Sequence, residues 1–153
     1  MKIFISYGND NLNLVEYVAR NLQPFGEVFY WNQNKELGQE AWKTIYSWID
    51  SCDLVIAIIT GQVVGRAMAV GNEVGRATAK GKTVVPLVTP EVPESALGCL
   101  NGITHQRMNL QNPQEAINNI QQTILKKKTE KEQQNALLVL GGAIVLLTIF
   151  SKE

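Results

Sequence analysis

Short apolar runs alternate with segments of helical periodicity through the first 125 residues of the chain. The apolar runs predict strands, and segments whose apolar side chains recur every three or four residues predict helices between them. The predicted strands lie at 2–6, 28–31, 53–59 and 83–88, with a short fifth strand within 103–110. The predicted helices begin near 12, before 42, near 67 and at Pro113, and Gly81 ends the third of them.

The order of these elements predicts an α/β fold. The run at 53–59 is apolar without interruption, which is typical of a strand buried on both faces of a parallel sheet. Because right-handed crossovers join strands that alternate with helices, we expect an open, parallel, five-stranded sheet with helices on both faces. Ligands bind such sheets at the carboxyl ends of the strands. This rule directs attention to the loops 8–11, 32–38 and 60–73.

A second segment follows the predicted domain at 1–125. Residues 126–135 are polar and rich in lysine, whereas 136–150 form the uncharged stretch ALLVLGGAIVLLTIF. We expect 126–135 to be a linker or helix extension and 136–150 to be an apolar helix that anchors a cytoplasmic domain to a membrane. A helix of that length rises ~22 Å. The hydrocarbon core of a membrane needs about 20 helical residues to span it, and this segment is about five residues shorter. Packing of this helix on a partner or on another copy is the alternative.

Charge and cysteine content narrow the classes of ligand. The chain has 14 basic and 14 acidic residues, so it lacks the basic excess that binding to nucleic acid requires. Cys52 and Cys99 have no metal-type spacing, and paired Cys or His ligands for a metal do not occur in the sequence. This use of cysteine fits a reduced, intracellular compartment.

The inventory of catalytic residues leaves one carboxylate to consider. His105 is the single histidine and no G-x-S-x-G motif is present, so the sequence does not support a Ser-His-Asp triad. Neither a Walker loop nor G-x-G-x-x-G follows the first strand. Glu73 lies on the predicted helix after the third strand, on the ligand side of the sheet. Favourable charge near the positive end of the helix dipole is the alternative explanation for a glutamate there.

Five short motifs occur in one order along the chain. They are IFISY at 3–7, LGQEAW at 37–42, IDSCDLVIAIIT at 49–60, NEVGRA at 72–77 and GKTVVP at 81–86. Together with NLQNPQEA at 109–116, they resemble a prokaryotic TIR (Toll/interleukin-1 receptor) domain over about residues 1–125. Each motif is weak alone, but five in register are fairly specific.

This resemblance implies a flavodoxin-like fold and, in many microbial members, cleavage of the nicotinamide–ribose bond of NAD by hydrolysis or cyclisation. NAD is then a substrate, and no bound cofactor or metal is implied. Glu73 falls at the family's catalytic glutamate, and 32–38 corresponds to a loop that covers a neighbouring molecule's site in active assemblies. Self-association through such loops, in a stress or antiviral signalling setting, is the implied mode of activation. The candidate substrate-binding residues are Ser6, Tyr7, Gly8, Asn9, Glu36, Gly38, Trp42 and Arg66.

Other interpretations stay open beside this one. The spacing of Trp42 with Ile45 and Ile49 favours a core position, and solvation at the surface is the simpler role for Arg66. The stretch AMAVGNE at 67–73 lacks the Ser and Trp of the pattern S-x-W-V-x-x-E found in catalytic members. The alternatives are a non-catalytic module that signals by self-association and a nucleoside deoxyribosyltransferase-like enzyme, whose fold also places a glutamate before a helix.

Overall fold

The computed structural model describes residues 1–8, 12–32, 40–61 and 67–150. Within them lies one parallel five-stranded sheet of order β2-β1-β3-β4-β5. The strands are β1 (Lys2–Tyr7), β2 (Glu27–Tyr30), β3 (Leu54–Ile59), β4 (Thr83–Val88) and β5 (Gln106–Arg107). All six residues of the central strand β3 are buried, as its unbroken apolar run predicts. The parallel sheet is confirmed, and the fifth strand is only two residues long.

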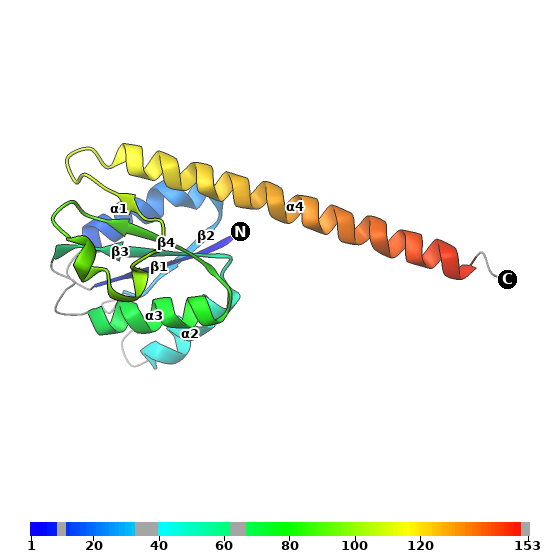
Figure 1. The fold of residues 1–153 in the computed structure, drawn as a ribbon, viewed down its shortest axis with the longest axis horizontal. Coiled ribbons are helices and arrows are strands. Elements are labelled where there is room, and N and C mark those ends of the chain that lie inside the picture. The colour runs from blue at the N-terminus through cyan, green and yellow to red at the C-terminus, as the bar shows by residue number, and fades with distance from the viewer. Residues whose placement is uncertain (9–11, 33–39, 62–66, 151–153) are drawn as a thin grey trace. The chain divides into compact units, whose positions relative to one another are not determined.

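The described residues form four α-helices, of which the first three and the first turns of the fourth pack on the sheet: α1 (Leu12–Leu22), α2 (Ala41–Ser51), α3 (Ala67–Ala79) and α4 (Gln114–Phe150). Figure 1 shows α2 and α3 together on one face of the sheet and α1 on the other. The first turns of α4 lie beside α1, because the Tyr17 hydroxyl donates to Gln114 Oε1 at 3.2 Å and Gln121 Nε2 donates to the Asn21 carbonyl at 3.0 Å. Single-turn 3-10 helices occupy Gln23–Phe25, Glu94–Ala96 and Gly98–Leu100.

The apolar faces predicted from helical periodicity form the core. In α1, Val15, Val18, Ala19 and Leu22 are all buried. Between the sheet and the pair α2 and α3, one cluster of buried side chains joins Phe4, Ile45, Ile49, Cys52, Val55 and Ala77. The third helix ends where the sequence predicts. Gly81, at φ +65°, follows it and its amide donates to the Thr78 carbonyl, while the Lys82 amide donates to the Ala77 carbonyl, which is a Schellman motif.

The C-terminal segment is helical, but its predicted role as a membrane anchor is not supported. The helix α4 continues from Gln114 through 126–135 and 136–150 to Phe150 without a break, as expected if 126–135 is a helix extension rather than a linker. The chain divides into two compact units, Met1–Gln121 and Gln122–Glu153. Among the described residues, no helix has both the length and the apolar character required to cross a membrane. The predicted membrane anchor is therefore not supported, because the apolar stretch is short and follows directly on a charged one.

Candidate active site

A cavity of about 180 Å³ opens at the carboxyl ends of β1 and β2, where residues of α2 and α3 supply its other walls. The position agrees with the expectation that ligands bind at this edge of a parallel sheet. Each wall comes from a different element: β1, the residue after β2, α2 and α3. The lining residues are Phe4, Ile5, Tyr7, Trp31, Ala41, Trp42, Ile45, Ala69 and Glu73.

Glu73 is the acidic residue in this lining, and its burial follows from its place on α3. Val70, Val74 and Ala77 form the buried face of the helix at helical spacing, and Glu73 lies on the same face with 7% of its surface exposed. A carboxylate that merely complements the helix dipole would lie at the surface, where water solvates it. The dipole explanation therefore does not account for this residue.

Two opposing effects set the protonation of Glu73. Burial raises the pKa of its carboxyl from an ordinary 4.5 to about 7, and the Ser6 hydroxyl partly offsets this by lowering the pKa. Ser6 lies on β1 and is wholly buried. Among the described residues, its Oγ is the buried side-chain atom for which no well-aligned hydrogen bond is formed. Ser6 therefore lowers the pKa of Glu73 as a polar neighbour, without forming a hydrogen bond of ordinary geometry.

Tyr7 connects two walls of the cavity. Its hydroxyl donates a hydrogen bond to the Trp31 carbonyl, which joins the carboxyl end of β1 to the residue after β2. Burial is the main cause that raises the pKa of Tyr7 to about 12, with smaller contributions from Tyr30, Glu73 and Glu16. The phenol therefore stays neutral at physiological pH and serves as a donor.

Aromatic rings form the apolar part of the site. The Trp42 ring lies 5.5 Å from that of Tyr46 between centroids, and Trp42 remains 45% exposed at the mouth of the cavity. The expectation that Trp42 is a core residue is wrong, since Ile45 and Ile49 carry the buried stripe of α2. Trp48, which is half-buried, packs against that stripe instead, with its ring 5.7 Å from Phe29 and 6.1 Å from Trp31.

The remaining candidate residues are placed only in part. Gly8 is buried directly after β1, while Asn9, Glu36, Gly38 and Arg66 lie outside the described residues. His105 precedes β5, where its Nε2 lies 3.3 Å from Glu94 Oε1 and it takes no part in the cavity. In the described part of the chain, no group of three or more His, Cys, Asp or Glu residues is arranged to hold a metal ion.

Sequence reasoning missed most of the apolar lining. Five lining residues look like ordinary core positions in the sequence: Phe4, Ile5, Ala41, Ile45 and Ala69. They belong to the site only because the fold brings them to the cavity that Glu73 lines. Trp31 carried a usable signal, because it stands at the carboxyl end of a predicted strand. A second signal was the spacing of Glu73 with Val70, Val74 and Ala77, which places a charge on an apolar helix face.

The sequence model of a family described as TIR domain matches residues 3–125. A search of curated proteins finds no significant match to this sequence. Solved structures resemble the chain at low identity. The TIR domains of the activated Roq1 resistosome, a structure described as directly recognizing the pathogen effector XopQ, give a TM-score of 0.64 at 13% identity, covering 80% of this chain and 98% of that one.

Two further solved structures share the fold. A prokaryotic SEFIR domain gives a TM-score of 0.57 at 17% identity and covers 80% of this chain and 91% of its own. A 2-deoxyribosyltransferase from Bacillus psychrosaccharolyticus gives a TM-score of 0.50 at 19% identity, covering 71% of this chain and 86% of that one. At such identities these likenesses show the α/β architecture alone.

Proposed function

This chain belongs to the TIR domain family, and on that premise we propose that it cleaves the bond between nicotinamide and ribose in NAD. Glu73 is the catalytic carboxylate of this proposal. The observation that carries it is the burial of Glu73 in a largely apolar cavity at the carboxyl ends of β1 and β2. No bound cofactor is required, because NAD is the substrate.

The chemistry suits a site that offers one carboxylate. When the bond from ribose C1′ to the pyridinium nitrogen breaks, its electron pair neutralises the ring, and nicotinamide leaves without needing a proton. Positive charge develops on C1′ and the ring oxygen, and an ionised Glu73 stabilises that charge most strongly where water is excluded. Water then adds to C1′ and loses a proton, or an adenine nitrogen adds to give a cyclic product.

The size of the cavity indicates which part of NAD it holds. Pockets for drug-sized ligands measure roughly 300–1,000 Å³, whereas this one measures about 180 Å³. It therefore suits the nicotinamide end of the dinucleotide, with Trp31 and Trp42 as aromatic walls. The adenosine end extends beyond it, toward the loops after the strands or a second copy of the chain.

Self-association completes the proposal. The Roq1 structure among the relatives is an activated resistosome, and we infer that copies of this chain likewise assemble and become active together. Glu36 and Gly38, which lie outside the described residues in the loop 32–38, are proposed to bind NAD where that loop covers the site of a neighbouring copy. The setting is a stress or antiviral signalling response.

The decisive test measures nicotinamide released from NAD by concentrated, full-length protein. Glu73→Gln keeps the size of the side chain and removes the negative charge, so release should fall at least 100-fold. Glu27→Gln is the matched control, because Glu27 is exposed at the amino end of β2, away from the cavity. Equal release by the wild type and by Glu73→Gln would refute the assignment.

Two other functions are distinguished by the same preparation. The deoxyribosyltransferase among the structural relatives raises transfer of deoxyribose between a nucleoside and a free base as a second candidate, measured by chromatography of mixed nucleosides. A non-catalytic signalling module would consume neither NAD nor deoxynucleosides and would still self-associate. Products from NAD would support NAD cleavage, products from deoxynucleosides would support the transferase, and products from neither would support the signalling module.

A further inference from the structure

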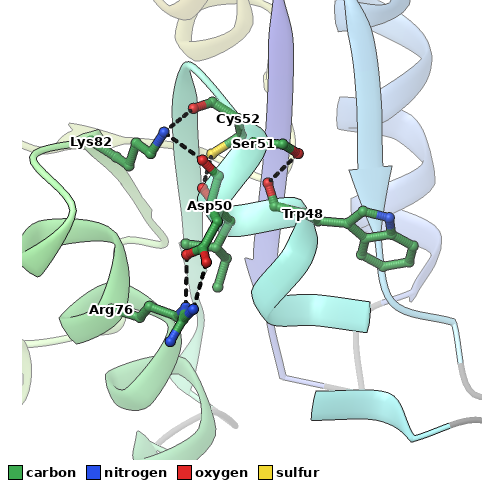
Figure 2. A network of polar contacts seen from close by, with 7 residues as sticks. Trp48, Asp50, Ser51, Cys52, Arg76 and Lys82 are labelled. Carbon is green, nitrogen blue, oxygen red and sulfur yellow. Dashed lines mark hydrogen bonds and ion pairs between the residues drawn. The ribbon is translucent and has the colours of Figure 1, made fainter. Parts of the chain in front are cut away.

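We propose that Arg76 is a positioning residue for Glu73, because it fixes α3 against α2, the helix that supplies the facing wall of the cavity. This inference deepens the NAD-cleaving function proposed above and rests on it for its catalytic consequence. Its structural basis is a set of polar contacts outside the cavity, drawn in Figure 2.

Arg76 makes a two-pronged contact with α2. Its Nε donates to Asp50 Oδ1 at 2.9 Å and its Nη2 donates to Asp50 Oδ2 at 2.6 Å, so the planar guanidinium meets the carboxylate edge to edge. The same guanidinium lies 4.4 Å from the centroid of the Tyr46 ring. Paired hydrogen bonds and a stacked ring fix direction as well as distance, which a single ion pair between flexible side chains does not.

Lys82 attaches to the same end of α2. Its Nζ donates to the carbonyls of Asp50 and Cys52, each at 2.8 Å, and Figure 2 shows these bonds beside the Arg76 pair. Lys82 follows the Gly81 turn that ends α3, so two side chains from the α3–β4 region hold the last turn of α2. The two helices are therefore joined through directed polar bonds as well as through the core.

The geometry relates this joint to the cavity. Arg76 stands three residues after Glu73, a rise of ~4.5 Å along α3. On α2, Tyr46 directly follows the turn from which Trp42 and Ile45 line the cavity, and Asp50 lies about one turn further on. A change in the spacing of α2 and α3 at the Arg76 contact therefore changes the distance between Glu73 and the facing wall.

Two glycines within α3 make the position of this helix more dependent on contacts such as the Asp50–Arg76 pair. Gly71 and Gly75 lie two residues before and after Glu73, and glycine inside a helix weakens it. Neither glycine has a neighbour within 4 Å of where a Cβ would stand, so this part of the helix gains little packing from those positions. Directed contacts such as the Asp50–Arg76 pair therefore add to the core packing of Val70, Val74 and Ala77 in setting its location.

The test follows the ionisation of Glu73 directly, in full-length protein labelled with ¹³C at glutamate carboxyl carbons and assigned with Glu73→Gln. In Arg76→Gln we expect water to enter between α2 and α3, which lowers the pKa of Glu73 from about 7 toward its ordinary range. Loss of a nearby positive charge would by itself raise that pKa, so a fall identifies the change in geometry. The value of kcat for nicotinamide release should fall at least fivefold with little change in KM.

Three further variants make the outcome decisive. Arg20→Gln is the matched control, because Arg20 is exposed on α1 and its Nε donates to the Glu16 carbonyl of the same helix. Asp50→Asn removes the pair from the other side and should reproduce Arg76→Gln, and the exchange Asp50→Arg with Arg76→Asp should restore part of the wild-type titration. An unchanged or raised Glu73 pKa in folded Arg76→Gln and Asp50→Asn would overturn the proposal. If the wild type releases no nicotinamide, the proposed function fails, while the titration still decides the positioning role.

Discussion

Ser6 on β1 and Glu73 on α3 are a buried hydroxyl and a buried carboxyl, and the hydroxyl lowers the pKa that burial raises. Sixty-seven positions separate the two residues in the sequence, and the crossing of β1 by α3 brings them together. Burial is the larger effect and Ser6 the smaller, opposing one, and together they set how much of Glu73 is ionised near neutral pH and so available for the proposed reaction.

Replacing Ser6 tests this relationship. In Ser6→Ala the carboxylate loses the hydroxyl that favours its charged form, so the pKa of Glu73 should rise above about 7. We expect nicotinamide release below pH 7 to fall roughly two- to fivefold, with a much smaller loss at pH 9, where Glu73 is ionised in both proteins. A pH–rate profile that drops by the same factor at every pH would contradict this role for Ser6.

The pH dependence of stability tests the burial of Glu73. Its folded-state pKa of about 7 exceeds the ordinary 4.5, so between these values the native state binds more protons than the unfolded state. Its contribution to stability is fully present below pH 4.5 and is lost as pH rises through 7, a loss of about 3 kcal/mol.

The variant Glu73→Gln removes this titration. It should be more stable than the wild type at pH 8. Between pH 5 and 8 its unfolding free energy should fall much less than that of the wild type. Urea unfolding at several pH values measures both effects, with Glu27→Gln as the exposed control. Parallel pH curves for the wild type and Glu73→Gln would show that the carboxyl is not buried in solution.

Two neighbouring residues of α2 separate a role in the cavity from a role in the core. Trp42 is 45% exposed and Ile45 is 5% exposed, although both line the cavity. We expect Trp42→Ala to change the unfolding free energy by less than about 1 kcal/mol and to raise KM for NAD several-fold. Ile45→Ala should cost about 2–5 kcal/mol. Equal destabilisation by the two changes, in urea unfolding, would argue against an aromatic wall at Trp42.

The glycines around the third helix give predictions of opposite sign. Gly75 lies inside α3 with open space where a Cβ would stand, so Gly75→Ala should stabilise the protein by roughly 0.5–1 kcal/mol. Gly81 has φ +65° in the Schellman turn, so Gly81→Ala should destabilise it by about 1–2 kcal/mol. Thermal unfolding of the two variants checks the signs. A stabilising Gly81→Ala would mean that the turn differs in solution.

The sequence by itself determined the order of the elements and the place of the candidate site. An unbroken apolar run marked β3 as a central strand, Gly81 marked the end of α3, and Glu73 followed a strand on the ligand side. These features are local, because apolar periodicity, glycine conformation and strand order act over a few residues each. The resemblance of five motifs to TIR domains then identified the family that the match over residues 3–125 shows.

Only the tertiary structure decided which side chains share the cavity and which environment Glu73 experiences. Trp42 satisfied the helical spacing of a core residue, yet packing left it 45% exposed at the mouth of the cavity and buried Ile45 and Ile49 of the same helix. The pairing of Asp50 with Arg76 joins residues on separate helices. The pKa of a carboxyl depends on its solvent and its neighbours, and both are fixed only when β1, α2 and α3 pack together.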